Sequence, residues 1–358
     1  MNQNQITNNS NDIQSKDGIV LLAKQAGLTS FSSLNSVKKA LNTKKVGHTG
    51  TLDSFAQGLL IVCTGHLTKL AGKITEFDKT YQAVIKFGEE TDTYEYTGKI
   101  TRTTPLPQKT DFEKAVHKFT GEIMQTPPFF SAIHINGERA SSLARNGQKV
   151  ELPARKVTVF NSKILDTVCN NQNQVEYALV EFTVSKGTYI RSLAFDIGRE
   201  CKSSANLAGL YRTKVGNFRI EDAAGYENIQ KFSIDTAIKT MNEQKEIIKL
   251  QENEQKQKKH FITTPQEIQL QQEILQKKLP FTQETAAQCG FTTAVLSSQA
   301  HQLFQNGKPL NYSFFKNNLD IEKMQSKTKL AVFTENNAFT GIIEKDENKK
   351  LKYIFVIK

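Results

Sequence analysis

A long polar segment limits most strongly what this chain can fold into. Between residues 241 and 278 the composition shifts to Gln, Lys and Glu, and residues 251–259 contain no apolar side chain. Such a stretch cannot supply a buried core, so we expect a linker or insertion between a main domain, residues 17–240, and a smaller domain, residues 279–358. Its few Ile and Leu residues at partial helical spacing permit a solvated helix, and a mobile coil is the alternative.

The first 16 residues are rich in Asn, Gln and Ser and predict a disordered tail. They contain no apolar core of signal-peptide length, and no run in the chain approaches the ~18 apolar residues of a spanning helix. We therefore expect a cytoplasmic protein without a membrane partner.

The cysteines and histidines show no metal-ligand spacing. Four cysteines are scattered without a C-x-x-C pair, and six histidines form no H-E-x-x-H motif. This pattern predicts reduced structural thiols, no metal and no cofactor. The cysteines are Cys63, Cys169, Cys201 and Cys289.

The main domain mixes predicted strands and helices. Residues 19–22 form a short apolar run, 81–87 alternate up to a glycine, and 174–185 alternate over a longer stretch, all typical of strands. Residues 30–41 have apolar side chains at helical spacing, with Phe31, Leu34, Val37 and Leu41 expected on one face. Helices are also expected over 111–120 and 187–201. Because the elements do not alternate regularly, the predicted class is α+β with a central mixed or antiparallel sheet.

The C-terminal part carries short β-rich runs separated by turn residues. Residues 330–333 and 353–357 are the clearest of them. This spacing predicts a small β-barrel-like module.

The charge balance favours a polyanionic partner. Lys and Arg number 47 against 36 Asp and Glu, which gives a formal net charge of +11. Counterion release makes nucleic acid the leading candidate, although a basic protein without a nucleic-acid partner has the same composition.

One glycine-punctuated loop, Val46–Leu60, contains an aspartate, Asp53, just before an apolar run. Loops of this kind place reactive side chains at surface clefts. The loop matches neither G-x-x-x-x-G-K-[ST] nor G-x-G-x-x-G, so nucleotide binding is not indicated. The structural alternative is that Asp53 caps a helix beginning at about Phe55.

The loop Gly47-His-Thr-Gly-Thr-Leu-Asp53 resembles the G-H-x-G-x-L-D motif of the TruB pseudouridine synthases. Six other segments resemble motifs of this family in the family's order. They are K-Q-A-G-L-T-S from Lys24, D-K-T-Y from Asp78, G-E-E-T-D-T from Gly88, Q-T-P-P-F-F-S-A from Gln125, S-K-G-T-Y-I-R from Ser185 and L-Y-R-T-K-V-G from Leu210. The resemblance covers residues 17–230 well and the C-terminal part loosely, where the family often carries a small RNA-binding barrel.

The resemblance implies a pseudouridine synthase fold and an enzyme that isomerises uridine 55 in the T loop of tRNA. We expect a monomer, although the sequence does not give the oligomeric state. Asp53 maps onto the catalytic carboxylate and Arg191 onto its ion-pair partner. The other mapped positions are substrate-binding: Tyr81 as the platform for the flipped base, Tyr189 and Leu210 in the pocket, His48 filling the vacated space, and Lys24 and Arg212 on phosphates. Five of these residues also have an alternative role that involves no substrate. Arg191 is then a structural clamp, Tyr81 an ordinary core residue of a strand, and His48, Lys24 and Arg212 are solvated side chains.

Five positions depart from the family pattern: Gln25, Ser54, Phe130, His134 and Tyr211. Two rival functions remain open from sequence. One is an RNA-binding or tRNA-folding module, which would not need Asp53 and Arg191, and the other is a synthase acting on a different RNA. Whether the carboxylate attacks C1′ or takes a sugar proton is open as well.

Overall fold

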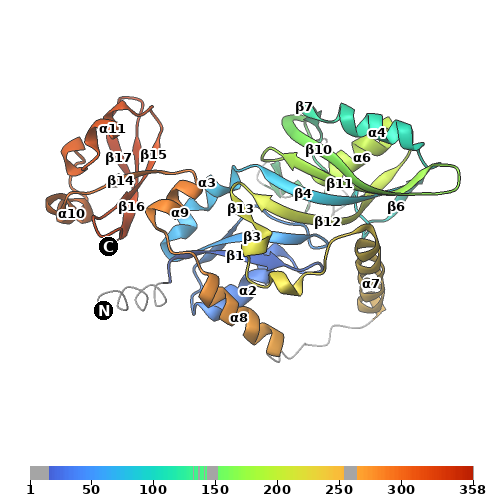
Figure 1. Cartoon of the computed structure of the whole chain (residues 1–358), viewed down its shortest axis with the longest axis horizontal. Helices are drawn as coiled ribbons and strands as arrows, with labels where there is room; N and C mark the ends of the chain where they lie inside the picture. Colours follow the sequence, from blue (N-terminus) through green and yellow to red (C-terminus); the bar gives the residue numbers. More distant parts are fainter. Residues whose placement is uncertain are drawn as a thin grey trace, which may run out of the picture.

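The computed structural model describes residues 16–131, 133–135, 138–140, 142, 152–253 and 264–357. The predicted tail therefore lies outside the described residues, apart from Lys16. In the described part, the main domain is built on a nine-stranded sheet with the order β1-β3-β12-β4-β11-β10-β7, with β2 paired to β3 and β13 to β12 (Figure 1). The strands are β1 Gly18–Lys24, β2 Val46–Thr49, β3 Gln57–Thr64, β4 Lys79–Phe87, β7 Gly121–Gln125, β10 Arg155–Cys169, β11 Val175–Val184, β12 Ala205–Val215 and β13 Phe218–Arg219.

The sheet is mixed because β3 and β12 run parallel whereas the other neighbours are antiparallel. This confirms the predicted α+β class and central mixed sheet. The parallel contact is short, Tyr211 opposite Gln57 and Arg212 opposite Gly58. It brings the start of β3, directly after the Asp53 loop, against the centre of β12. The family's catalytic loop and its Leu210 motif are thereby neighbours.

The run after Asp53 is a strand, not a helix. Residues 58–64 of β3 are all buried, between β1 on one side and β2 and β12 on the other. A continuous apolar run of this length fits a strand covered on both faces. The structural alternative in which Asp53 caps a helix from Phe55 is therefore wrong.

The helices of the main domain are α2 Ser30–Ala40, α3 Ala71–Thr75, α4 Lys109–Lys118 and α6 Ile190–Glu200, with 3₁₀ turns η2 Gly65–Leu70, η3 Ile220–Asp222 and η4 Tyr226–Asn228. Short two-stranded sheets are formed by β5 Glu89–Thr91 with β6 Ile100–Thr103, and by β8 His134–Ile135 with β9 Glu138–Arg139. In α2, Leu34 and Val37 are buried as expected. Phe31 is 69% exposed, so it does not pack with Leu34 and Val37 in the core. Its ring instead lies under the Lys38 ammonium, 4.7 Å from the centroid.

The polar segment contains parts of two helices, α7 Ile234–Asn253 and α8 Pro265–Lys277. Helix α8 packs against α2, and its Ile274 is fully buried with Leu270 one turn earlier against the same cluster. Its start is fixed by a capping box between Thr264 and Glu267. In these described parts the segment is helical and mostly exposed, as the helical alternative predicts, and two apolar residues at i, i+4 anchor α8 on one side.

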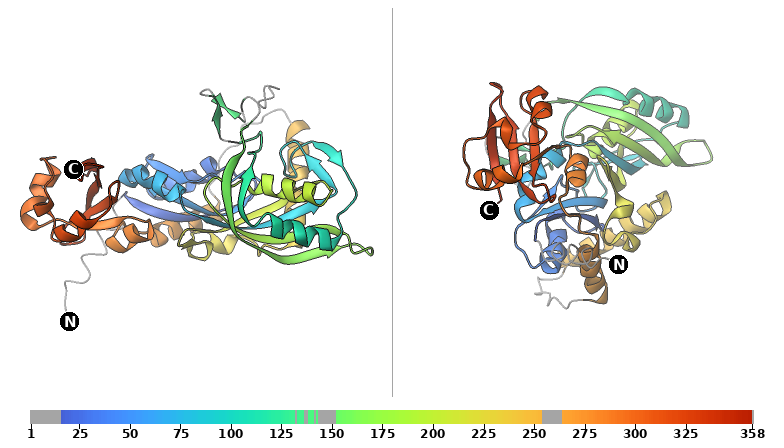
Figure 2. Two further views of the ribbon diagram at one scale, coloured as in Figure 1. Left: turned by 90° about the horizontal axis from the view of Figure 1, so that it is seen from above. Right: turned by 60° about the vertical axis from the view of Figure 1, so that its left-hand side comes forward.

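The C-terminal part forms a four-stranded sheet in the order β14-β15-β16-β17, at one end of an elongated molecule (Figure 2). Its elements are α9 Gln283–Gln288, β14 Thr292–Val295, α10 Ser298–Gln305, η5 Tyr312–Phe314, α11 Asn318–Lys323, β15 Lys329–Phe333, β16 Phe339–Lys345 and β17 Leu351–Val356.

One hydrophobic cluster joins the two parts of the molecule. It combines Leu59 and Ile61 of β3 with Phe291, Phe333 and Phe355 of the C-terminal part. The backbone also crosses the boundary, since Ile19 and Leu279 exchange two N–H to C=O hydrogen bonds of 3.0 and 2.8 Å. The C-terminal sheet is therefore packed onto the main domain. In the described part of the chain, no helix is long and apolar enough to span a membrane.

Candidate active site

A cavity of about 300 Å³ opens beside Asp53. It is bordered by the loop between β2 and β3, by β4 and β12, and by the segment that leads into α6. Five of the predicted site residues besides Asp53 line it, namely Tyr81, Tyr189, Arg191, Leu210 and Arg212. The structure thus brings together residues that lie up to 159 positions apart, from Asp53 to Arg212.

Asp53 and Arg191 form a bidentate ion pair. Arg191 Nε donates to Asp53 Oδ2 at 2.9 Å and Nη2 donates to Oδ1 at 3.1 Å. The arginine side chain is 5% exposed, while the aspartate side chain is 38% exposed. A buried cation therefore fixes a carboxylate that still faces the cavity, and the two parallel bonds define its orientation.

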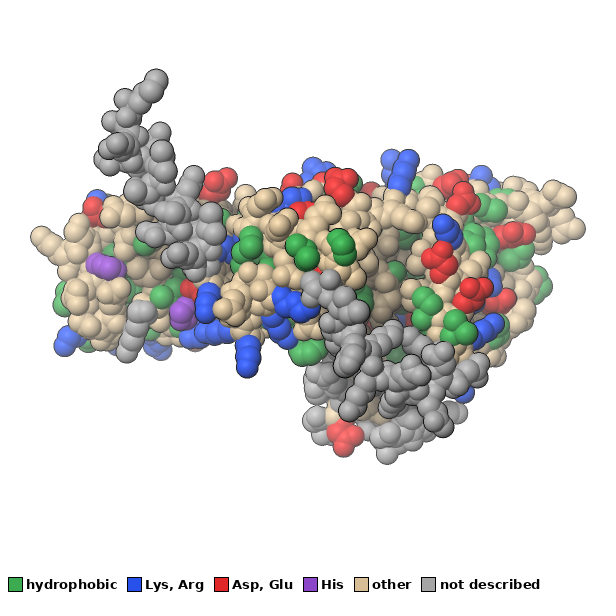
Figure 3. All heavy atoms as spheres, turned by 90° about the horizontal axis from the view of Figure 1, so that it is seen from below, with side chains coloured by type: hydrophobic (Ala, Val, Ile, Leu, Met, Phe, Trp, Pro, Cys, Tyr) green, Lys and Arg blue, Asp and Glu red, His purple; other side chains and the backbone are tan. Residues whose placement is uncertain are grey.

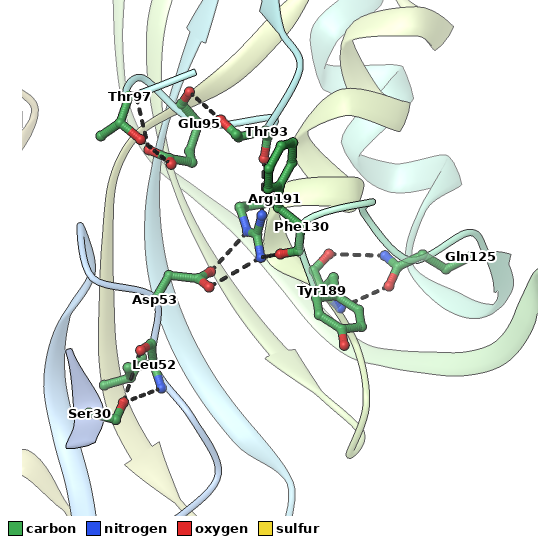
Figure 4. Close-up of polar contacts among 10 residues, drawn as sticks. All are labelled: Ser30, Leu52, Asp53, Thr93, Glu95, Thr97, Gln125, Phe130, Tyr189 and Arg191. Carbon is green, nitrogen blue, oxygen red and sulfur yellow. Dashed lines mark hydrogen bonds and ion pairs between the residues drawn. The ribbon is translucent and has the colours of Figure 1, made fainter. Parts of the chain in front are cut away.

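Arg191 is itself held by backbone carbonyl groups. Its Nη1 donates to the Thr93 carbonyl at 3.1 Å, and its Nη2 donates also to the Phe130 carbonyl at 2.9 Å (Figure 4). Arg191 lies in the first turn of α6, after Tyr189 as N-cap. Both readings of this arginine thus have support in the geometry, since it clamps three segments and pairs with the carboxylate.

The loop before Asp53 is fixed by Ser30, the first residue of α2. Ser30 Oγ accepts from the Leu52 amide and donates to the Leu52 carbonyl, both at 2.9 Å. On the other side of Asp53, the Gly27 amide donates to the Ser54 carbonyl at 2.8 Å. The segment that opens α2 therefore holds the backbone on both sides of the aspartate.

A second side chain fixes the backbone before Arg191 in the same way. The Gln125 amide group accepts from the Tyr189 N–H at 2.8 Å and donates to the Tyr189 carbonyl at 3.1 Å. Gln125 is 1% exposed at the end of β7. Figure 4 shows that this pair and the Ser30 pair flank the central ion pair.

The apolar wall of the cavity comes from Tyr81, Leu210 and Tyr189. Tyr81 on β4 is 9% exposed and Leu210 on β12 is 5% exposed. Arg155 stacks over the Tyr189 ring, with its guanidinium carbon 5.1 Å from the centroid. Aromatic and apolar faces beside a carboxylate suit a planar base attached to a sugar.

Lys24 does not reach the cavity. It is 1% exposed, and its Nζ donates to the carbonyls of Gln25, Ser54 and Ala56 at 3.0, 3.3 and 2.5 Å. All three ammonium donors are used, so the prediction that Lys24 contacts phosphate is wrong. Burial lowers the pKa of Lys24 to about 7, and the negative charge of Asp53 opposes that shift.

Arg212 is also buried, 1% exposed, yet it borders the cavity. Its Nε donates to the Leu59 carbonyl at 2.7 Å and its Nη2 to the Gly50 carbonyl at 3.1 Å. It therefore supports the Asp53 loop from inside the protein and not from the outer surface, and its predicted contact with phosphate stays a prediction. His48 lies on β2, outside the set of residues that line the cavity. Its pKa is lowered, first by burial and then by Arg212, and its buried Nδ1 has no hydrogen-bond partner among the described residues.

Several residues of the site were not predicted. Ser30, Gln125 and Lys79 lie inside the motifs quoted above, but a motif does not say which backbone or cavity its side chain meets. Glu95 lies just past the T-D-T motif and is 8% exposed. Burial raises its pKa, whereas hydrogen bonds from Thr97 and the Arg191 charge oppose the shift. Glu95 is not among the residues that line the cavity, and its carboxyl group accepts hydrogen bonds from Thr97.

The departures from the family pattern have different surroundings. Gln25 lines a second cavity and Ser54 uses only its carbonyl. Phe130 lines the active cavity, so the usual tyrosine hydroxyl is replaced by an apolar edge. Tyr211 is buried against Phe232 at a ring-centroid distance of 5.4 Å. The side chain of His134 lies outside the described residues. In the described part of the chain, no group of three or more His, Cys, Asp and Glu could hold a metal ion.

Comparison with known proteins agrees with this geometry. A family model described as "TruB family pseudouridylate synthase (N terminal domain)" matches residues 38–190. The tRNA pseudouridine synthase B of Treponema denticola is 38% identical over 366 residues, which cover 96% of this chain and 99% of the relative. The tRNA pseudouridine synthase B of Borreliella burgdorferi strain ZS7 is 43% identical over 220 residues, 61% of this chain and 77% of the relative.

Solved structures with low sequence identity share the fold. The crystal structure of a Cbf5-Nop10-Gar1 complex has a chain with a TM-score of 0.60 at 18% identity, covering 97% of this chain and 86% of that chain. The curated relatives and the matching family model show the class of the protein, a pseudouridine synthase, and the fold agrees with it. On the similarity along its full length, the chain belongs to the TruB family of pseudouridylate synthases. The predicted family and the predicted enzyme class, an isomerase, are confirmed.

Proposed function

We propose that this protein converts uridine 55 in the T loop of tRNA to pseudouridine, with Asp53 as the catalytic carboxylate. The observation that carries the proposal is the half-exposed Asp53 side chain, fixed by a buried Arg191 inside a cavity with aromatic walls. The printed names of the relatives, tRNA pseudouridine synthase B, support tRNA as the substrate.

The reaction breaks the bond between C1′ and N1, rotates the uracil and forms a bond between C1′ and C5. N1 gains a proton and C5 loses one, so there is no net oxidation and no added group. The chemistry asks for an ionised carboxylate beside the sugar, acting on C1′ or on a sugar proton. The bidentate Arg191 pair favours the ionised form of Asp53 and aims its oxygens.

The detached uracil must be kept in place while it turns. Tyr81, Tyr189 and Leu210 supply the surfaces for this, because stacking and apolar contact hold a planar base without fixing one edge of it. Taking the target nucleotide out of its stack costs a few kcal/mol, which these contacts offset. His48 remains a candidate for filling the vacated space in the RNA, next to the loop.

Basic side chains on the surface supply RNA contact. Lys69, Lys73 and Lys329 line a groove between the α3 region and the C-terminal sheet. On the face seen in Figure 3, Lys and Arg side chains gather near the C-terminal part, at the left, and toward the middle of the molecule. Such charges bind the phosphate backbone and make affinity dependent on salt.

The deciding experiment compares the parent protein with Asp53→Asn, using tRNA transcripts and mapping of pseudouridine. The substitution keeps the shape and removes the charge, so turnover should fall at least about 1,000-fold while tRNA affinity stays within about twofold. An Asp53→Asn variant that reacts at a rate close to that of the parent would refute the carboxylate mechanism.

Two rivals give other outcomes. If the parent binds tRNA and forms no pseudouridine, the protein is an RNA-binding or tRNA-folding module. If product appears only in a different RNA, the chemistry holds and the tRNA target is wrong. The buried ion pair favours the enzyme, because binding alone does not require an oriented carboxylate within a cavity.

A further inference from the structure

Two buried cations on the cavity wall have no role in the chemistry described above. Lys79 on β4 is 7% exposed and Arg212 on β12 is 1% exposed. Both line the same cavity as Asp53. Charged side chains are seldom buried without a partner of opposite charge, so their surroundings need an explanation.

Backbone carbonyl groups orient the two cations without neutralising them. Lys79 Nζ donates to the Thr75 carbonyl at 2.6 Å and to the Phe77 carbonyl. Arg212 uses its Nε and Nη2, as described above. No carboxylate of the described residues forms an ion pair with either side chain. Asp78, the nearest acidic residue in sequence, is exposed and only raises the pKa of Lys79 slightly against larger opposing effects.

Both side chains have N–H groups without a hydrogen-bond acceptor among the described residues. An ammonium group has three donors and a guanidinium group five, so donors remain on Lys79 Nζ and on Arg212 Nη1. Arg212 Nη1 has no hydrogen bond to any residue that the structure describes. These donors border a cavity, and the cavity is the place where a ligand could accept them.

Gly50 forms the gap between the two cations. A Cβ atom built on Gly50 would lie 3.7 Å from Arg212 Nη1 and 3.9 Å from Lys79 Cε. Its φ of +78° is a conformation that favours glycine. The missing side chain therefore leaves open space beside both donors.

The charges around this space are predominantly positive. The pKa of Lys79 is lowered to about 8, first by burial and then by Arg212, and Lys186 adds to the effect. A bound anion would relieve this repulsion and satisfy the free donors at once. A phosphate oxyanion fits, since lysine and arginine are its usual partners.

We propose that Lys79 and Arg212, at the open face of Gly50, bind a backbone phosphate of the RNA that adjoins the target uridine. The inference rests on the proposed function, which places the sugar of that uridine at Asp53 in the same cavity. A phosphodiester is attached to each side of the sugar, so a nucleotide whose sugar lies at Asp53 brings an anion to the cavity that Lys79 and Arg212 also line. The phosphate would hold the sugar while the base turns.

The test combines a neutral phosphate with a neutral side chain. T-arm hairpins are synthesised with one methylphosphonate on the 5′ or the 3′ side of the target uridine, and kcat/KM is measured for the parent, Lys79→Met and Lys79→Arg. At one of the two positions the methylphosphonate should cost the parent about tenfold, and Lys79→Met should cost about the same with ordinary RNA. Together the two changes should cost little more than either alone, since both remove one interaction. Lys79→Arg should recover part of the loss.

Lys86→Met is the matched control. It lies on the same strand and pairs with Glu89 at 2.6 Å, away from the Asp53 cavity. Its effect should add to that of the methylphosphonate. Additive losses of kcat/KM for Lys79→Met and the methylphosphonate would overturn the proposal. A parent protein that is insensitive to a methylphosphonate on either side of the uridine would overturn it as well, and this second result does not depend on the stability of any variant.

Two further outcomes separate the alternatives. If inorganic phosphate competes with ordinary RNA in the parent but both methylphosphonates react normally, the site binds free phosphate and the RNA assignment is wrong. If the parent modifies no hairpin and no tRNA, the proposed function has failed. If the parent forms pseudouridine in an Asp53-dependent manner but the effects of the methylphosphonate and of Lys79→Met are additive, only the proposed phosphate site is refuted and the proposed function stands.

Discussion

Ser30 and Leu52 are joined by two reciprocal hydrogen bonds of 2.9 Å, so a serine side chain pairs with the backbone of the residue before Asp53. Ser30 is 3% exposed, and no water is needed to complete this pair. The helix α2 is thereby connected directly to the loop that carries the carboxylate.

We predict that Ser30→Ala lowers kcat about tenfold and leaves KM nearly unchanged. Without the two hydrogen bonds to Leu52 the Asp53 carboxylate is less well oriented, whereas the side chains that line the cavity are unchanged. Single-turnover conversion of tRNA measures this. Ser33→Ala is the control, since Ser33 on the same helix bonds only to the Thr29 carbonyl. Equal losses in both variants would mean that the effect comes from the helix and not from the loop.

Gln125→Leu should act on the other half of the ion pair. The two bonds to Tyr189 are lost and buried backbone groups are left unpaired, which costs about 1–3 kcal/mol of stability. Thermal unfolding should show a lower melting temperature, together with a fall in kcat. Gln125→Glu retains one acceptor for the Tyr189 amide and should lose less activity. A Glu variant that is as impaired as the Leu variant would contradict the orienting role.

Tyr81→Ala should bind tRNA within about threefold of the parent and react at least about 100-fold more slowly, because the flipped base loses its stacking surface. Tyr81→Phe retains the ring and should preserve stacking. Filter binding and rapid-quench assays separate the two effects. If Tyr81→Phe is as slow as Tyr81→Ala, the hydroxyl group acts in the chemistry and stacking is not the main role.

Lys24 should influence stability and not RNA affinity. Its pKa in the folded protein is about 7, against 10.5 as the reference. Between these values the unfolded chain holds the proton more strongly, so the free energy of unfolding should rise as pH increases from 7 toward 10. In Lys24→Met this rise should be smaller, as measured by denaturant unfolding at several pH values. The dependence of tRNA affinity on salt concentration should be the same in Lys24→Met as in the parent. A weaker dependence in the variant would show that Lys24 contacts phosphate after all.

Removal of residues 279–358 should destabilise the main domain. Phe291, Phe333 and Phe355 fill one cluster with Leu59 and Ile61, so truncation exposes the inner face of β3. We expect a lower melting temperature and aggregation in addition to weaker RNA binding. A truncated protein with the parent's melting temperature and only a raised KM would show that the C-terminal part is an independent appendage.

The sequence predicted much of the site because its motifs are local. The Asp53 loop, the strand around Tyr81 and the Arg191 segment could each be recognised on their own, and the α+β class followed from mixed periodicities. What the sequence could not provide was the path of side chains between motifs. A basic side chain such as Lys24 suits phosphate contact, but its stem is buried and its ammonium group donates to three carbonyl groups, which no motif shows. The packing of α8 on α2 could not be predicted for a similar reason, since Leu270 and Ile274 are too few to change the composition of the polar segment and sufficient to anchor the helix.

The cluster that joins β3 to the C-terminal phenylalanines also fixes the distance between the C-terminal sheet and the Asp53 cavity. Because the two parts share one core and the paired backbones of Ile19 and Leu279, the spacing between the basic groove at Lys329 and the carboxylate of Asp53 is constant. Under the proposed function, an RNA that contacts both the groove and Asp53 must present its target uridine at one fixed distance from the part that is bound in the groove. Lengthening or shortening the RNA helix between these two contacts by one base pair should then move the uridine away from Asp53, whatever the sequence of that helix.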